Sequence, residues 1–448
     1  MSADEFSWVL FRPRLHFPCV PYHGLLQHSL DRFPDKIATV FGSQKLSFRE
    51  IDALSNSLGR TLCALQVTKG DRVALFMTNR PEYLISFEAV SKIGAVITPL
   101  NPAYREAEAE YQLADSEACV AIVREDKFAI VDAIRHKLPA LKHVIVVGSE
   151  QPARTVSFYD AVRATSAEPL APVKLNLDED IVALPYSSGT TGLPKGVMLT
   201  HRNLVANAIQ ATAAGRITDR DTLLIFLPFY HIYGTMLMGQ AVAAGATQVI
   251  MERFDVVTSL SVIQQHHVSL LYTVPPALLA YANAAELKCF DLSSVRYIMS
   301  GAAPLPPEVG KRVNELTGIP VLQGYGLTEA SPLTHLSPVD NPELIRPGSI
   351  GLSVSEQEDK IVDIDTGTQE VGTDQVGELV VRGPQVMKGY WKAPEETARV
   401  LRDGWLRSGD LGEWTVPELV QICRTRRCST YSAAATPSGT PEEHPWVP

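Results

Sequence analysis

The chain has 448 residues, of which 45% are hydrophobic and 20% are charged, and this balance predicts a globular protein of roughly two to four structural units rather than a disordered one. The formal net charge is −10, which argues against a nucleic-acid-coating protein because phosphate binding needs a basic surface. Six scattered cysteines lack zinc-ligand spacing and the N-terminus lacks a signal-peptide shape, so we expect reduced thiols and a cytoplasmic location.

Apolar strand-like runs alternate with helical stretches along most of the chain, and this alternation is typical of parallel sheets covered by helices on both faces. Residues 222–251 contain no Asp, Glu, Lys or Arg, but proline and glycine interrupt them, so they predict strand, loop and buried helix rather than a transmembrane span. In chain order we expect strands at 72–77, 95–98, 119–123, 143–147, 181–186, 223–227, 269–272, 295–299 and 320–323, and helices at 82–93, 104–116 and from about 202.

The residue composition and the hydrophobic pattern of the sequence change at three places. An Ala/Pro-rich stretch at 168–174 marks a seam, short strands between glycines follow Pro347, and from Glu413 the chain becomes rich in Pro, Ser, Thr and Ala. We therefore expect an α/β protein with two stacked αβα layered subdomains whose sheets are largely parallel, a small β-rich subdomain and a disordered C-terminal tail. The expected bounds are 1–24 for an N-terminal extension, 25–172, 173–346 and 347–412 for the subdomains, and 413–448 for the tail.

Residues 186–201 read YSSGTTGLPKGVMLTH and gather hydroxyl groups and glycines around one lysine, Lys195. Glycines let the backbone approach a ligand closely, successive N–H groups form an anion nest, and Lys195 adds positive charge. This combination suits a di- or triphosphate. It differs from the Walker pattern of P-loop kinases, since Lys195 is followed by Gly196 rather than by Ser or Thr.

The run 187–196 closely resembles the phosphate-loop signature of the AMP-forming adenylate enzymes. This superfamily contains acyl- and aryl-CoA ligases, beetle luciferases and peptide-synthetase adenylation domains. The resemblance extends from about residue 25 to Gly412 and is strongest for the CoA ligases. Its further motifs follow in the family's order at 228–234 (PFYHIYG), 300–305 (SGAAPL), 323–329 (QGYGLTE), 377–391 and 408–410 (SGD).

The resemblance implies a role for each matching residue. Thr328 would lie near the α-phosphate of ATP, Glu329 would hold Mg²⁺ with Thr190 as a second candidate ligand, and His231 would lie at the acyl pocket. Asp410 would accept hydrogen bonds from the ribose hydroxyls, and Tyr325 would stack on adenine. The phosphate loop would comprise Ser187, Ser188, Gly189, Thr190, Thr191, Gly192 and Lys195, and the backbone close to adenine and acyl group would be Gly301, Ala302, Gly324 and Gly326.

The implied reaction has two steps. A carboxylate attacks the α-phosphate of magnesium-bound ATP and releases pyrophosphate, and coenzyme A then displaces AMP from the acyl-adenylate to give a thioester. The expected cofactors are ATP, Mg²⁺ and coenzyme A, and the expected partner is a small carboxylic acid, with no nucleic acid. Fatty and aryl acids both remain open, and the sequence indicates no oligomeric state.

The residues after Gly412 do not match the family. Its members carry a small C-terminal domain there, with a lysine that serves adenylation, whereas residues 413–448 match neither its hinge nor this lysine, as a frameshift, an alternative exon or a mis-called gene model would produce. We therefore expect an AMP-forming acyl- or aryl-CoA synthetase impaired by truncation. The alternative is a non-catalytic isoform or pseudoenzyme that binds ATP or acyl-adenylate, and a luciferase-type oxidation would use the same platform.

Overall fold

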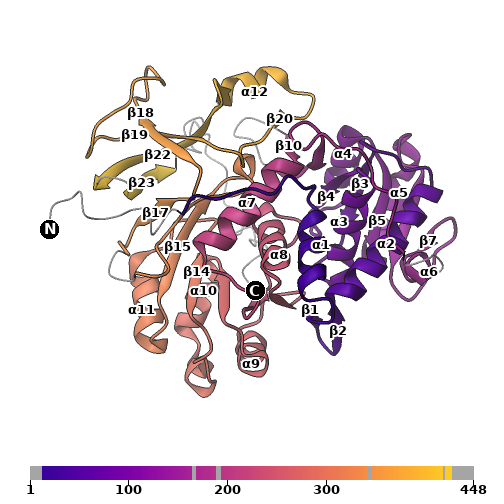
Figure 1. The fold of residues 1–448 in the computed structure, drawn as a ribbon, viewed down its shortest axis with the longest axis horizontal. Helices are drawn as coiled ribbons and strands as arrows, with labels where there is room; N and C mark the ends of the chain where they lie inside the picture. Colours follow the sequence, from indigo (N-terminus) through magenta and orange to yellow (C-terminus); the bar gives the residue numbers. More distant parts are fainter. Residues whose placement is uncertain (1–12, 164–167, 188–192, 342–344, 417–418, 426–448) are drawn as a thin grey trace, which may run out of the picture.

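The computed structural model describes residues 13–163, 168–187, 193–341, 345–416 and 419–425. In these ranges the strands form two large sheets, one of nine strands and one of 14. Figure 1 shows the nine-stranded sheet with its helices on the right in indigo and purple, and the other sheet from the pink centre to the yellow strands at the upper left. The predicted α/β class, with sheets rich in parallel strands and a small antiparallel β part, is confirmed.

The first sheet has parallel strands at its centre and an antiparallel edge. Its order is β20 (Gly389–Tyr390), β10 (Lys195–Thr200), β8 (Ile181–Ala183), β4 (Val96–Pro99), β3 (Arg72–Phe76), β5 (Ala118–Arg124), β6 (His143–Val147) and β7 (Val156–Ser157), with β9 (Tyr186–Ser187) beside β10. Its helices are α2 (Phe48–Ala64), α3 (Pro81–Lys92), α4 (Glu106–Ser116), α5 (Glu125–Ile134) and α6 (Phe158–Arg163), and η3 (Arg135–Lys137) follows α5.

Helices cover both faces of this sheet, as the alternation of its side chains requires. Successive residues of a strand point to opposite faces. Val73 and Leu75 of β3 therefore belong to the same core as α2, α3 and α6, while Ala74 and Phe76 pack with residues of α4 and α5. Both faces are apolar, which explains the uninterrupted hydrophobic runs in the sequence.

The second sheet is parallel in one half and antiparallel in the other. Its order is β18 (Glu358–Val362), β19 (Gly377–Arg382), β22 (Trp405–Val416), β23 (Leu419–Thr425), β17 (Ser349–Ser353), β16 (Leu333–Leu336), β15 (Val321–Gly326), β14 (Tyr297–Ser300), β13 (Leu270–Thr273), β11 (Thr222–Ile225), β12 (Thr247–Ile250), β1 (Ile37–Phe41) and β2 (Gln44–Ser47), with β21 (Leu401–Arg402) beside β22. The parallel half runs from β15 to β1.

Most of the remaining helices accompany the second sheet. They are α1 (Gly24–Arg32), α7 (His201–Ala214), α8 (Ile232–Ala244), α9 (Val256–His266), α10 (Pro275–Asn283), η4 (Ala285–Cys289), α11 (Pro307–Thr317), η5 (Thr328–Ala330) and α12 (Pro394–Val400). Helix α7 begins at a capping box between Thr200 and Asn203. Helix α8 is buried along nearly its whole length, so it is a core helix, as residues 222–251 predicted. In the described ranges, no helix combines the length and apolar character that crossing a membrane requires.

Sheet membership departs from the expected boundary near residue 172. Strands β1 and β2 precede that boundary but extend the second sheet, because β1 pairs with β12. Strands β8, β9 and β10 follow it but complete the first sheet. The expected strand 181–186 is divided into β8 and β9, and Lys195–Thr200 forms antiparallel β10 where only a loop was expected before the helix. The two layered halves therefore interlock.

The sheet also continues beyond Gly412, where we expected a tail to begin. Strand β22 extends to Val416, and β23 pairs with it and with β17. The boundary placed at 412 therefore falls inside a β-hairpin. The local composition could not reveal this, because it gives no sign of pairing with strands far along the chain. Residues 426–448 lie outside the described ranges.

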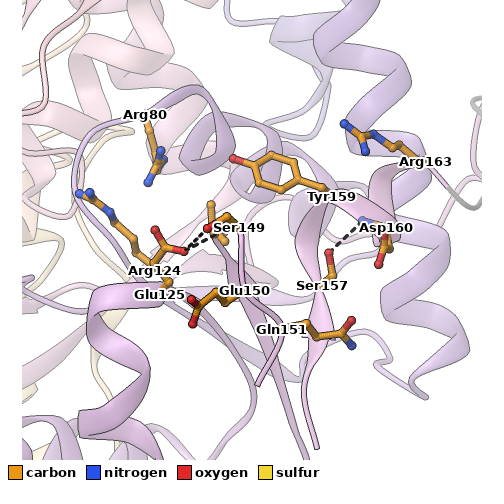
Figure 2. A pocket seen from close by; sticks show the side chains of 12 residues that line it. Arg80, Arg124, Glu125, Ser149, Glu150, Gln151, Ser157, Tyr159, Asp160 and Arg163 are labelled. Carbon is orange, nitrogen blue, oxygen red and sulfur yellow. Dashed lines mark hydrogen bonds between the residues drawn. The ribbon is translucent and has the colours of Figure 1, made fainter. Parts of the chain in front are cut away.

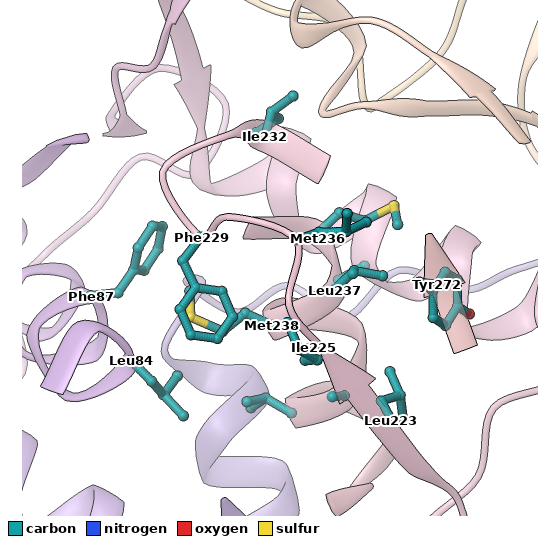
Figure 3. Close-up of a cluster of buried hydrophobic side chains, with 14 of the residues drawn as sticks. Leu84, Phe87, Leu223, Ile225, Phe229, Ile232, Met236, Leu237, Met238 and Tyr272 are labelled. Carbon is teal, nitrogen blue, oxygen red and sulfur yellow. The ribbon is translucent and has the colours of Figure 1, made fainter. Parts of the chain in front are cut away.

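Helix α3 joins the two halves of the molecule. Its residues 81–91 are all buried, because one side faces the first sheet and the other faces the second half. Figure 3 shows Leu84 and Phe87 of α3 beside Phe229 and Met238 of the second half. The ring centroids of Tyr83 and Phe229 lie 5.4 Å apart. This shared core fixes the loop that precedes α8, which contributes to the site described next.

Candidate active site

A cavity of about 520 Å³ lies near the carboxyl ends of the parallel strands β13, β14 and β15. Ligands of open α/β sheets commonly bind at this edge, where the loops after parallel strands converge. The cavity lies between these strands and helix α8. The expected site residues that line it are His231, Gly301, Ala302, Gly324, Tyr325, Gly326, Thr328 and Asp410.

Glu329 follows this lining in the short helix η5 and is 7% exposed. Its Oε1 accepts hydrogen bonds from Ser187 Oγ at 3.1 Å and from Tyr390 OH at 2.9 Å. Its Oε2 is buried and has no hydrogen-bond partner in the part of the chain that the structure describes. A buried carboxylate oxygen without a partner is rare in folded proteins. The arrangement leaves one oxygen of Glu329 available to a ligand.

Lys195 begins β10 and pairs in register with Ser187 of β9. Its Nζ donates a hydrogen bond to Glu396 Oε2 on α12 at 2.7 Å and lies 5.6 Å from the ring centroid of Tyr390. Tyr390 thus connects Lys195 with Glu329. The other expected phosphate-loop residues are Ser188, Gly189, Thr190, Thr191 and Gly192, which lie outside the described ranges.

Tyr325 and Asp410 approach each other across the cavity lining, although 85 residues separate them. Tyr325 OH, from β15, donates a 2.6 Å hydrogen bond to Asp410 Oδ2, from β22. Asp410 is 7% exposed, and its backbone N–H donates to Ser408 Oγ at 3.1 Å. A flat aromatic ring and a carboxylate therefore form one edge of the cavity, a combination that suits a base and its sugar hydroxyls.

Two glycines of the lining are closely packed, and Gly326 has no room for a side chain. A Cβ on Gly326 would lie 2.2 Å from Pro332 O, and a Cβ on Gly301 would lie 3.2 Å from the ring of Tyr233. Beside Gly301, Ala302 has a φ of 67°, a left-handed conformation that costs a non-glycine residue free energy. The loop after β14 is therefore held in a strained shape close to the aromatic wall.

His231 is both a structural residue and a cavity residue. It is the N-cap of α8, where its Nδ1 accepts a hydrogen bond from Tyr233 N–H at 3.2 Å. Its exposed side chain lines the rim of the cavity. Thr328, at the start of η5, lines the same cavity.

Three residues that organise this site had no predicted role. Tyr390 donates to Glu329, Glu396 pairs with Lys195, and Asn79 braces the loop before His231. Asn79 is 3% exposed, and it donates to Leu227 O at 2.8 Å and accepts from Phe229 N–H at 2.7 Å. Asn79 follows a buried parallel strand, and this position in the sequence is the signal that could have identified it as a residue near the site.

A second cavity, of about 490 Å³, lies at the carboxyl ends of β5 and β6 in the first sheet. Figure 2 shows its polar lining. Arg80 pairs with Glu82 at 3.0 Å, and Arg124 pairs with Glu252. The charged residues that line it are Arg80, Arg124, Arg163, Glu125, Glu150 and Asp160. Equal numbers of positive and negative groups give this cavity no net charge to attract an anion, and it contains none of the expected site residues.

The fold and the motif-bearing cavity define an adenylate-forming enzyme. Residues 26–391 match the family model described as AMP-binding enzyme, and the chain belongs to this family. Its relatives are acyl- and aryl-CoA ligases, that is, acid–thiol ligases that form AMP.

Two relatives illustrate the range of acids in the names of these ligases. The chain is 35% identical over 425 residues to a long-chain-fatty-acid–CoA ligase of Bacillus subtilis (strain 168), covering 89% of this chain and 75% of the relative. It is 37% identical over 420 residues to 4-coumarate–CoA ligase 5 of Oryza sativa subsp. japonica, covering 90% of this chain and 76% of the relative.

Solved structures agree with the fold. The N-terminal domain of FACL13 from Mycobacterium tuberculosis superposes with a TM-score of 0.82 at 28% identity, covering 90% of this chain and 99% of that one. ATP-bound MatB from Rhodopseudomonas palustris superposes with a TM-score of 0.81 at 29% identity, covering 90% of this chain and 78% of that one.

Proposed function

We propose that the chain activates a small carboxylic acid with ATP to form an acyl-adenylate and then transfers the acyl group to coenzyme A. One observation carries this proposal: the linked Glu329–Tyr390–Lys195 cluster lies beside the cavity that Tyr325 and Asp410 line. This arrangement offers a lysine for phosphates, a carboxylate for a cation, and a ring with a carboxylate for a nucleoside. A cytoplasmic location suits such an enzyme, and the free thiols of Cys19, Cys63, Cys119 and Cys289 support it.

The role of each site residue follows from its charge and from its position at the cavity. Lys195, Ser187 and residues 188–192 would hold the β- and γ-phosphates, which leave together as pyrophosphate, because a fixed cation and oriented donors offset the repulsion between anions. The carboxylate oxygen of the substrate would attack the α-phosphorus near Thr328. The sulfur of coenzyme A would then attack the acyl carbon, and AMP would leave. His231, at the rim, would adjoin the acyl group.

The nucleoside would lie along the other edge of the cavity. Tyr325 would stack on adenine between Gly324 and Gly326, and Asp410 would accept hydrogen bonds from the ribose hydroxyls. Gly301 and Ala302 would face the bound adenylate through their backbone. The Tyr325–Asp410 hydrogen bond supports this assignment, because it holds the ring and the carboxylate in a fixed relation to each other.

The described residues fit Mg²⁺. The unpartnered Oε2 of Glu329 is an oxygen ligand of the kind that a hard cation prefers. No group of three or more His, Cys, Asp or Glu in the described part of the chain could hold a metal, so phosphate and water oxygens would complete the coordination. Glu329 would hold the ion, with Thr190 as a second candidate ligand. When bound, Mg²⁺ would neutralise phosphate charge.

Pyrophosphate exchange tests this function directly. The 448-residue chain is incubated with ATP, Mg²⁺, labelled pyrophosphate and a panel of fatty and aryl acids. We expect label to enter ATP only when an accepted acid is present, and Glu329→Gln to slow this exchange about 100-fold, as loss of a charge-stabilising group does. Absence of both exchange and ATP binding would overturn the proposal.

A second candidate is a chain that binds ATP or the acyl-adenylate but turns over slowly. The resemblance implies that a lysine beyond the motif at 408–410 serves adenylation, and residues 413–448 contain no lysine. Saturable ATP binding without acid-dependent exchange would favour this candidate. Thioester formation from a supplied acyl-adenylate and coenzyme A would then show whether the second step survives.

A further inference from the structure

The carboxylate of Glu329 is oriented by two donors that come from two strands paired with β10. Ser187 Oγ, from β9, and Tyr390 OH, from β20, both donate to Oε1, whereas Oε2 has no hydrogen-bond partner among the described residues. Strands β9 and β20 each pair antiparallel with β10. The direction in which Oε2 points therefore depends on where β9 and β20 lie.

One residue in the last turn of α4 contacts the chain next to both donors. Asp115 Oδ2 accepts a 2.5 Å hydrogen bond from the hydroxyl of Tyr186, the residue before Ser187. The backbone oxygen of Asp115 accepts a 3.0 Å hydrogen bond from the indole N–H of Trp391, the residue after Tyr390. Figure 1 shows α4 close to β10 and β20. Asp115 therefore ties together two segments that lie far apart in the sequence.

Further contacts keep these two anchors in place. Tyr111, one helical turn earlier on α4, donates to Pro194 O at 2.9 Å, and its ring centroid lies 6.5 Å from that of Tyr186 in an edge-on arrangement. The backbone N–H of Trp391 donates to Gly196 O of β10 at 2.8 Å. Burial raises the pKa of Tyr186 well above its usual range, and the carboxylate that accepts its hydrogen bond raises it further, so the hydroxyl keeps the proton that it donates.

We propose that Asp115 is a positioning residue for the cation ligand Glu329. It fixes β9 through Tyr186 and the end of β20 through Trp391, and so it fixes both donors that orient the carboxylate. Groups that lie behind a metal ligand orient it and tune its affinity for the ion. This inference rests on the proposed function and adds a residue that supports its Mg²⁺ site.

The test measures ATP binding, so it does not depend on turnover. ATP is titrated into the 448-residue chain by calorimetry, once with excess Mg²⁺ and once with EDTA. The ratio of the dissociation constant in EDTA to that in Mg²⁺ is the Mg²⁺ enhancement, which we expect to exceed one in the unaltered chain. Tyr186→Phe deletes a single hydroxyl. We expect it to lower the enhancement about tenfold, as loss of groups that orient a metal ligand does, without weakening ATP binding in EDTA.

Tyr159→Phe is the matched control. Tyr159 OH donates to Glu82 Oε1 at 2.7 Å, so this variant loses a comparable bond between tyrosine and carboxylate at another place and should keep the enhancement. Asp115→Asn retains an oxygen acceptor and should keep most of the enhancement, whereas Asp115→Leu should resemble Tyr186→Phe. Because Asp115→Leu and Tyr186→Phe remove the same hydrogen bond, their combination should cost no more than either change alone.

A chain without the charge of Glu329 separates positioning from a general structural defect. Glu329→Gln should already lack the enhancement, so adding Tyr186→Phe should not weaken ATP binding further, whereas a structural defect would. If Asp115→Leu fails to fold, Tyr186→Phe still tests the same bond. An unchanged enhancement in Tyr186→Phe, or an equal loss in Tyr159→Phe, would overturn the inference. Failure of the unaltered chain to bind ATP would instead overturn the proposed function.

Discussion

At the scale of single residues, Lys195 forms an ion pair with Glu396. Its 2.7 Å ion pair with Glu396 joins β10 to α12, and both side chains are partly exposed. A phosphate ligand must compete with this carboxylate for Lys195. We therefore expect Glu396→Gln to tighten pyrophosphate binding about two- to fivefold, the range typical of a partly exposed pair. Calorimetric titration measures this, with Glu395→Gln on the same helix as control, and unchanged affinity in Glu396→Gln would contradict it.

Glu88 is a buried acid that the proposed reaction does not use. It is 0% exposed, and both carboxyl oxygens lack hydrogen-bond partners within the described ranges. Burial raises its pKa from 4.5 to about 8, with Lys92 lowering and Asp52 raising it. The folded protein therefore keeps a proton between these values that the unfolded chain releases, so stability falls as the pH rises from 4.5 through 8.

Replacing this carboxyl should remove the pH dependence that it causes. We expect Glu88→Gln to be more stable than the unaltered chain at pH 8 and to show a flatter stability profile between pH 5 and 8, because Gln does not titrate. Urea unfolding at several pH values measures this. A parallel profile in the two proteins would mean that Glu88 does not carry the dependence.

Individual site residues differed in how far the sequence could identify them. Glu329 and Asp410 were predicted as site residues because they belong to motifs, and their side chains contact Tyr390 and Tyr325. Tyr390 lies in a motif too, but its contact with Glu329 spans 61 residues, and no local pattern encodes such a partner.

At the scale of elements, α1 is held to the fold by two neutral histidines. Tyr22 N–H donates to Nδ1 of His201 at 3.0 Å, so that nitrogen must be unprotonated. Burial lowers the pKa of His23 to about 4 and that of His201 to about 3; Lys92 and Lys69 also lower them, while Asp52 and Asp180 raise them. The unfolded chain takes up these protons near pH 6.5, so stability falls as the pH drops from 6.5 toward 4.

Helix α1 should therefore loosen in acid before the sheets do. We expect amide protection in Gly24–Arg32 to fall between pH 6.5 and 5 while the protection of β3 persists. Hydrogen exchange with mass spectrometry measures both. His201→Asn keeps an acceptor for Tyr22 without titrating in this range and should weaken the effect, whereas the variant of an exposed histidine, His136→Gln, should not. Simultaneous loss of protection in α1 and β3 would contradict the prediction.

The elements that were predicted share one property, a local hydrophobic signal. Runs such as 72–77 and 143–147 are buried on both sides and appear as β3 and β6. Strand β10 was missed because it starts inside the glycine-rich loop and is defined by its antiparallel neighbours β8, β9 and β20. Strand β23 was missed likewise, since pairing with β22 and β17 overrides a weak local preference.

At the scale of the whole molecule, the interlocked sheets make the two layered halves dependent on each other. The first sheet needs β8 and β10 from beyond residue 172, and the β1–β2 hairpin needs β12. An isolated two-stranded hairpin is marginally stable in water. We therefore expect a fragment of residues 13–172 to lack a native fold, as judged by near-ultraviolet circular dichroism and hydrogen exchange. A cooperatively folded fragment would show that the first half is autonomous.

The same interlocking predicts how the full chain unfolds. Helix α3 is buried between the halves, so neither half can open without exposing apolar side chains of the other. Exposing a shared core raises the free energy of any partly unfolded state, which suppresses intermediates. We therefore expect scanning calorimetry of the 448-residue chain to show one transition with equal calorimetric and van't Hoff enthalpies. Phe87→Ala removes a buried ring from this junction and should lower the transition temperature, through a loss of about 3–5 kcal/mol. If the halves were instead independent, this variant would split the transition into two.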